Sequence, residues 1–228
     1  MIASPELLIS KAFFDKEIPA KIETNKALGQ ISYHLALNPS DYVFKKFQRN
    51  LNLNSEHVTQ TEAEFANAMK QFVLVNDKSA TGWRIFENDD VSRRKVLEGI
   101  RSEKASIEIA MGYLYLIYNL LLGSGQIQQM QMSELYDRAK IFIKIFPEPI
   151  ALYKYVMENL TNSEFNLMEN SRSNFVWDIH LMFNVGNNSI GQEKLHFVTS
   201  DKAIIRTAVA ENAKYNIWTF DEYMELLK

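Results

Sequence analysis

Residues that break helices are scarce in this chain, which has only 8 Gly and 5 Pro among its 228 residues. Gly and Pro are the strongest interruptions of regular structure, so their scarcity favours long helices over many short strands. The apolar fraction of 46% and the charged fraction of 23% are ordinary for a globular protein and exclude the disordered and collagen-like classes. A chain of this length predicts one large domain or two small ones.

Apolar residues recur at helical spacing through most of residues 1–165. The longest such pattern predicts one helix from Val91 to Leu122, about 30 residues or ~48 Å long. Its first half carries many charges, whereas its second half is apolar on nearly all sides. A helix segment that is apolar all round belongs in a core, so we expect the second half to be buried.

The last 50 or so residues have a different pattern, with short apolar runs at 195–199 and 215–220 on either side of a predicted helix at 201–212. A strand, a helix and a strand in so short a space form a βαβ unit, which requires a parallel sheet. The predicted fold is therefore α/β and predominantly helical, with a small parallel sheet near the C-terminus. Residues 1–165 should form a helical region that shares one core with residues 166–228, because no flexible linker divides them.

Composition and motifs exclude several kinds of site. Cysteine is absent, so the chain has no disulfide, no thiolate zinc site and no cysteine nucleophile. The net charge of -3 gives no overall attraction to nucleic acid. The sequence also lacks the glycine-rich motifs of dinucleotide and nucleoside-triphosphate sites and the Gly-x-Ser-x-Gly motif of serine hydrolases.

The sequence shows no targeting signal. The N-terminal run from Met1 to Glu6 lacks the basic and apolar segments of a signal peptide. The most apolar stretch, Met111 to Leu122, has 12 residues, which is too short to cross a bilayer. We therefore expect a cytoplasmic protein that does not associate with a membrane.

A carboxylate directly follows the first predicted C-terminal strand. The apolar run ends in Thr199-Ser200-Asp201, and a helix begins at once. Asp201 is thus predicted at the carboxyl edge of a parallel strand, where open α/β sheets bind ligands. The alternative is that Asp201 is only an N-cap, whose side chain accepts hydrogen bonds from the amides of the following helix.

The run from Phe197 to Lys202, followed by a helix and by the run from Tyr215 to Tyr223, resembles the end of PIN-domain nucleases over about 55 residues. The resemblance implies that Asp201 is a metal ligand and catalytic residue, with Thr199 and Ser200 in support. Asp178, at the start of the preceding helix, would be the second such Asp. The implied activity is cleavage of RNA phosphodiester bonds with Mg²⁺ or Mn²⁺ held by clustered carboxylates. Such hard cations prefer oxygen ligands and activate water.

The sequence departs from the family pattern in its first strand. PIN domains begin with a strand that ends in an Asp, and the nearest string here, Lys21 to Asn25, is expected to be helical. Candidates for a further acid are Glu62, Glu64 and Glu108. Glu108 is our third candidate metal ligand because it adjoins the apolar half of the long predicted helix, although a solvated or snorkelling position is the more usual explanation for such a residue.

Two groups of basic residues are candidates for contacts with RNA. Both also fit solvated helix faces, which is the usual meaning of such runs. If RNA binds, they supply the electrostatic attraction, because phosphate contacts dominate non-specific affinity. The first group is Lys45, Lys46 and Arg49, and the second is Arg93, Arg94 and Lys95.

Two hypotheses of different classes follow. The first is a PIN-like metal-dependent ribonuclease whose partner is RNA, and it requires at least three carboxylates within reach of one cation. The second is a non-catalytic helical binding or regulatory protein with a degenerate PIN-like region and a protein partner. This second hypothesis needs no carboxylate cluster and predicts an exposed apolar surface instead.

Overall fold

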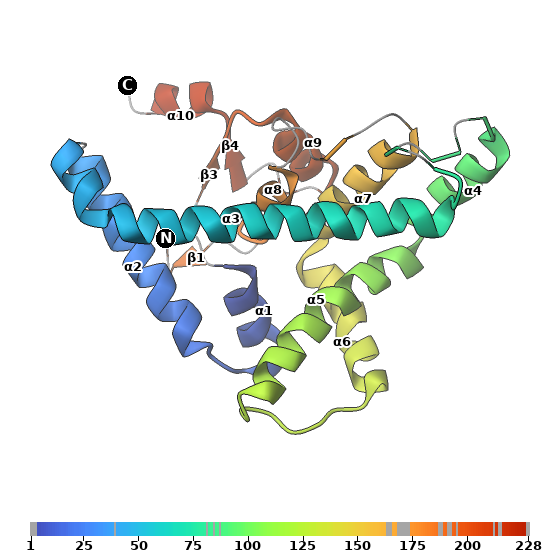
Figure 1. Cartoon of the computed structure of the whole chain (residues 1–228), viewed down its shortest axis with the longest axis horizontal. Helices are drawn as coiled ribbons and strands as arrows, with labels where there is room; N and C mark the ends of the chain where they lie inside the picture. The colour runs from blue at the N-terminus through green and yellow to red at the C-terminus, as the bar shows by residue number, and fades with distance from the viewer. Residues whose placement is uncertain are drawn as a thin grey trace.

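Figure 1 shows a computed structural model of the chain, in which helices form most of the fold and two short pairs of strands lie towards the C-terminus. The structure describes residues 4–38, 40–80, 82–83, 85–86, 88–162, 166–167, 174–186, 189–190, 193–194, 196–211, 213 and 216–226.

The helices follow one another with few breaks. Their bounds are α1 Pro5–Phe14, α2 Pro19–Leu37, α3 Asp41–Asn76, α4 Asp90–Arg101, α5 Glu103–Gly123, α6 Met132–Ile145, α7 Pro147–Asn162, α8 Phe175–Met182, α9 Lys202–Ala210 and α10 Phe220–Leu226. The strands are β1 Ser189–Ile190, β2 Glu193–Lys194, β3 Phe197–Val198 and β4 Ile217–Trp218.

The longest helix, α3, crosses the width of the molecule in Figure 1, with α5 and α6 below it. Its 36 residues make it about 54 Å long. The stretch from Lys21 to Asn25 lies inside α2, so the expectation that it is helical is confirmed. The described residues therefore contain no counterpart of the first PIN strand at this position.

The prediction of a single helix from Val91 to Leu122 is wrong, because the helix is interrupted at Ser102. This residue has an extended backbone, with φ -65° and ψ 157°, and its hydroxyl accepts a hydrogen bond from the Ala105 amide at 3.2 Å. A serine that caps a new helix competes with continuation of the old one. The result is two helices, α4 and α5, which pack against each other.

The second half of α5 is not buried all round as predicted. Leu114, Ile117 and Leu121 face the core, whereas Leu116 is 61% exposed and Leu120 is 45% exposed. Neighbouring helices cover only one side of α5, so its other side remains open although it is equally apolar. By length and composition alone, α5 as a whole is long and apolar enough to cross a membrane, a criterion that core helices also meet.

The predicted βαβ unit is present. Strands β3 and β4 pair in parallel, with Phe197 opposite Ile217 and Val198 opposite Trp218, and α9 connects them. The fold is confirmed as predominantly helical with a small parallel sheet. Leu195, at the predicted start of the first strand, lies outside the described residues. An antiparallel pair of strands, β1 and β2, precedes β3.

The core is built around the ring of Phe142 on α6, which is fully buried. Its centroid lies 5.4 Å from that of Phe13, 6.0 Å from that of Tyr113, 5.2 Å from that of Phe146 and 6.0 Å from that of Phe183. These rings come from α1, α5, the turn after α6 and the end of α8. The same cluster of buried side chains extends to residues of α9 and β4, so both regions of the chain contribute to it.

Replacing Phe142 by Ala should lower the free energy of unfolding by about 3–5 kcal/mol, because it removes the ring that four others contact and leaves a cavity. Chemical denaturation followed by circular dichroism measures the change. The neighbouring Ile141, which is 52% exposed, provides the control. Ile141→Ala should change the same quantity by roughly 0.5 kcal/mol or less, and equal losses in the two variants would contradict this account of the core.

Candidate functional site

Asp201 is the N-cap of α9, as the alternative interpretation of the sequence proposed. Its Oδ1 accepts hydrogen bonds from the amides of Ala203 at 2.8 Å and Ile204 at 2.9 Å. The carboxylate is exposed and lies just beyond the end of β3. Capping occupies only one of the two carboxylate oxygens in these contacts, so the cap does not by itself exclude a second role.

Asp178 lies in the first turn of α8, close enough to Asp201 for the two charges to interact. Partial burial raises the pKa of Asp178 to about 6, and the negative charge of Asp201 contributes further to the rise. The structure thus brings together the two carboxylates that the sequence singled out. A shared positive charge or a proton would relieve their repulsion.

The supporting residues hold Asp201 in place. The Thr199 hydroxyl accepts a hydrogen bond from the Asp201 amide at 3.0 Å, and the Thr199 amide donates to the Trp218 carbonyl at 3.0 Å. Thr199 thereby links the cap of α9 to the edge of β4. Ser200 is exposed between them.

These residues do not fit a three-carboxylate metal site. No group of three or more His, Cys, Asp or Glu side chains that could hold a metal ion occurs in the part of the chain that the structure describes. The expectation that Glu108 joins the pair is not met, because Glu108 lies on an exposed face of α5 with Lys104 Nζ 3.7 Å from its Oε1. Glu62 instead accepts a hydrogen bond from the Trp177 indole at 2.9 Å.

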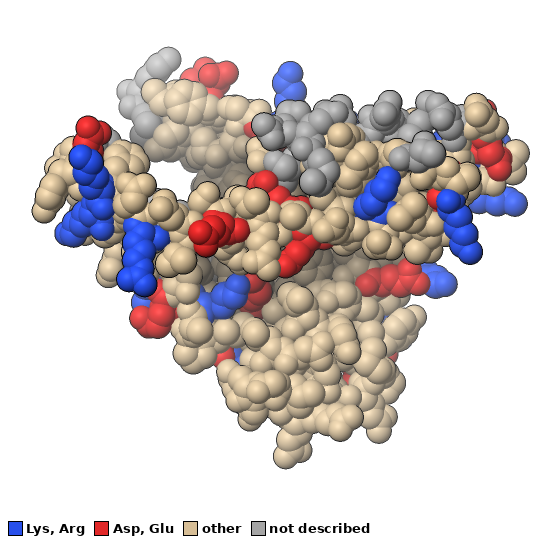
Figure 2. Space-filling model, viewed as in Figure 1, with Lys and Arg blue, Asp and Glu red and all other residues tan. Residues whose placement is uncertain are grey.

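The two basic groups lie far apart. Lys45, Lys46 and Arg49 are exposed near the start of α3, whereas the second group is on α4, beside the other end of α3. Figure 2 shows Lys and Arg side chains near both ends of this helix. Arg93 is half-buried and forms an ion pair with Asp90. The two groups therefore form separate surfaces rather than one track for a nucleic acid.

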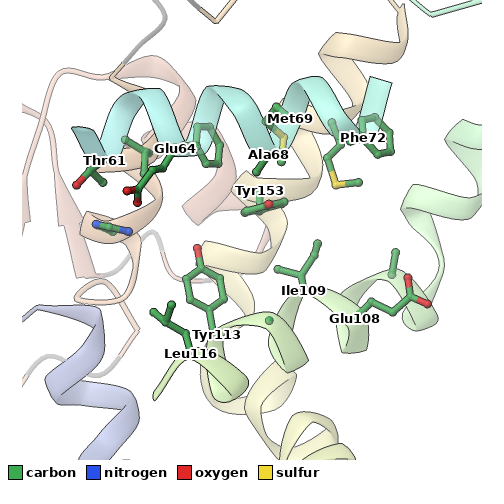
Figure 3. A pocket seen from close by; sticks show the side chains of 16 residues that line it. Thr61, Glu64, Ala68, Met69, Phe72, Glu108, Ile109, Tyr113, Leu116 and Tyr153 are labelled. Carbon is green, nitrogen blue, oxygen red and sulfur yellow. The ribbon is translucent and has the colours of Figure 1, made fainter. Parts of the chain in front are cut away.

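A cavity of about 610 Å³ lies between α3 and α5, and α7 and α8 contribute to its wall (Figure 3). Most of its lining is apolar and comes from side chains that are far apart in the sequence. The sequence analysis did not identify this cavity, because no local pattern distinguishes its lining from ordinary core positions. The apolar lining includes Phe65, Met69, Phe72, Ile109, Met157 and Val176.

Two tyrosines, Tyr113 of α5 and Tyr153 of α7, point into the cavity in Figure 3. Burial raises the pKa of both phenols, that of Tyr153 to about 12, so both are neutral at physiological pH. Among the described residues neither hydroxyl has a hydrogen-bond partner within the protein. Both hydroxyls are therefore available to a ligand.

His180 of α8 lines the cavity together with Thr61 and Glu64 of α3. Burial lowers the pKa of His180, so its imidazole is neutral at pH 7. The Trp177 indole ring meets the His180 ring edge to face at 5.5 Å between centroids. Because Trp177 also donates to Glu62 of α3, this contact holds α8 against α3 beside the cavity.

A buried carboxyl that the sequence analysis missed is Glu148, in the first turn of α7 and only 5% exposed. Burial raises its pKa, and the charge of Glu211 adds to the rise. A Cβ at Gly186 would lie 2.8 Å from Glu148 Oε1, so the Glu148 carboxyl packs closely against this glycine. Nothing in its local sequence distinguishes Glu148 from a solvated glutamate at a helix start.

Comparison of the chain with family models, with curated proteins and with solved structures gives no match. Any functional conclusion therefore depends on the geometry of the carboxylate pair and of the cavity.

Removing the charge of Asp201 should lower the pKa of Asp178 from about 6, while burial keeps it above the ordinary value of 3.8. The test is Asp201→Asn, because Asn caps a helix as well as Asp does. Carbon-detected NMR titration of the Asp178 carboxyl measures the pKa. Asp89→Asn alters another N-cap, that of α4, and should leave the Asp178 pKa unchanged.

The same pKa has a consequence for stability. The folded-state pKa of Asp178 lies above its unfolded value, so the folded chain binds this proton more tightly. The resulting stabilisation is complete below about pH 3.8 and is lost as the pH rises through about 6. Asp178→Asn should weaken this pH dependence, and an unchanged pH profile of the melting temperature would contradict the assignment.

Proposed function

We propose that this chain is a non-catalytic binding protein whose functional site is the cavity between α3 and α5. The observation that carries the proposal is a cavity of about 610 Å³ with an apolar lining that includes two half-buried tyrosines. Small-molecule sites are typically concave spaces of about 300–1,000 Å³, mostly apolar, with a few polar groups that orient the ligand. A small molecule with an apolar body fits this description.

The open side of the cavity supports the proposal. Leu116 lines the cavity and is also exposed at the surface of α5, so an apolar surface leads into the cavity from outside. Such surfaces on a soluble protein commonly mark binding sites. The hypothesis of a binding protein predicted an exposed apolar surface of this kind.

Filling the cavity tests the proposal. Gly112 lines the cavity, and a Cβ built there would meet no atom within 4 Å. Gly112→Leu should abolish the fluorescence enhancement of Nile red, a neutral dye that reports apolar sites. The variant should not be destabilised, because Leu has a higher helix propensity than Gly by roughly 0.5–1 kcal/mol.

Gly99→Leu is the matched control, because Gly99 is also helical with open space around its Cβ position but lies outside the cavity lining. It should bind the dye like the unmodified protein. Equal dye binding by both variants, with both folded by circular dichroism, would contradict the cavity as the binding site.

We propose a PIN-like ribonuclease as a second candidate, because one specific observation favours it. Asp178 and Asp201 lie close enough for their charges to interact, and Asp201 follows the first strand of a parallel βαβ unit. The described residues supply no third ligand for a metal ion.

Under this second proposal, the protein should cleave single-stranded RNA in the presence of Mn²⁺ or Mg²⁺. Asp178→Asn and Asp201→Asn should each abolish the cleavage, because hard cations need the carboxylate charge. A gel assay of a labelled RNA, with and without chelator, measures the activity. Cleavage that survives either substitution, or no cleavage by the folded protein with either metal, would overturn the second proposal.

A further inference from the structure

We infer that the cavity binds an organic ammonium cation with an apolar substituent. The inference rests on the proposed binding function and names the ligand class for that same site. Three features carry it: the arrangement of aromatic rings in the cavity wall, the sign of the charges around the cavity, and the rigidity of the rings.

The ring of Tyr153 meets two other aromatic rings of the lining at nearly right angles. The centroids of Phe65 and Tyr153 are 5.8 Å apart with planes at 88°, and those of Tyr113 and Tyr153 are 6.5 Å apart with planes at 80°. Rings from α3, α5 and α7 thus surround one corner of the cavity in different orientations. Aromatic faces within about 6 Å of a cation attract it, and aromatic cages of this kind select quaternary ammonium groups.

The charges around the cavity have one sign. Glu64 and Glu108 both line it and are well separated in Figure 3, whereas the described lining contains no Lys or Arg. Lys104 approaches Glu108, but its side chain is largely exposed and is not part of the lining. A carboxylate ligand at the aromatic corner would be repelled by Glu64, whereas an ammonium ligand there gains from its charge.

The ring of Tyr113 is held in place before any ligand binds. Tyr113 stacks on Phe142 with planes 11° apart and meets Phe183 edge to face at 5.2 Å between centroids. Both phenylalanines belong to the fully buried core. A preorganised site loses less conformational freedom on binding, so its contacts contribute more to affinity.

The size of the cavity defines the rest of the ligand. A volume of about 610 Å³ exceeds that of a trimethylammonium group several-fold, so an alkyl or aryl substituent is needed to fill it. The apolar side chains Met69, Phe72 and Ile109 lie beyond the aromatic corner and suit such a substituent. The ammonium belongs at the aromatic corner near Glu64.

The test uses three soluble probes that share one bulky head: choline, its uncharged isostere 3,3-dimethylbutan-1-ol, and the anion 3,3-dimethylbutanoate. NMR titration of the full chain measures each affinity. Choline should bind on the order of tenfold more tightly than the alcohol, the effect of about 1.4 kcal/mol of cation–π and charge attraction. The anion should bind most weakly of the three.

Two variants locate the preference. Tyr153→Leu removes a ring and Glu64→Gln removes a charge, and each should reduce the ratio of choline to alcohol affinity at least about threefold. Tyr136→Leu and Glu56→Gln are the controls, because these exposed residues of α6 and α3 lie outside the cavity lining. Both controls should keep the ratio unchanged.

The outcomes separate this inference from the proposed function. Equal binding of choline and the alcohol, with Nile red still bound in a Gly112-dependent way, would overturn the ammonium inference and leave the binding function intact. If neither probe nor dye binds the folded protein, both proposals fail. Preference for choline that persists in Tyr153→Leu and Glu64→Gln would place the cation elsewhere and overturn the inference.

Discussion

The packing of aromatic rings around Phe142 is the interaction on which the rest of the structure depends. This ring contacts Phe13 of α1, Tyr113 of α5 and Phe183 at the end of α8, so three helices are positioned against α6 through one side chain. Aromatic pairs prefer particular stacked or edge-to-face geometries, so the cluster constrains the orientations of the helices as well as their contact. The ring of Tyr113 belongs both to this core and to the cavity, and the core therefore determines where one wall of the candidate site lies.

The cavity exists because α3 packs against α7 and α8 while space remains between α3 and α5. The contact of Phe65 with Tyr153 and the hydrogen bond from Trp177 to Glu62 hold α3 in that position. Because these contacts hold α3 in position, its apolar side chains face an unfilled space. That surface is therefore available to a ligand. The proposed binding function follows from this arrangement and not from any motif.

The carboxylate pair shows how one sequence pattern can serve two physical purposes. Asp at the start of a helix that follows a strand is typical both of an N-cap and of a ligand at a sheet edge. The structure confirms the cap at Asp201 and places Asp178 close by, with a pKa that both burial and the neighbouring charge raise. The described residues supply no third carboxylate beside this pair.

The sequence by itself determined the local structure: the helical class, the βαβ unit and the N-cap at Asp201 could all be predicted, because periodicity and capping are short-range properties. The sequence did not determine the break at Ser102, because a serine that caps a new helix cannot be told by sequence from a serine inside a continuous helix. It did not determine the exposure of Leu116 either, because an apolar helix face has the same pattern whether it is buried or exposed. Only the tertiary structure decided the cavity. Its wall joins side chains of four helices, and which apolar positions fill the core and which face an open space depends on how distant helices pack, a property that no local pattern records.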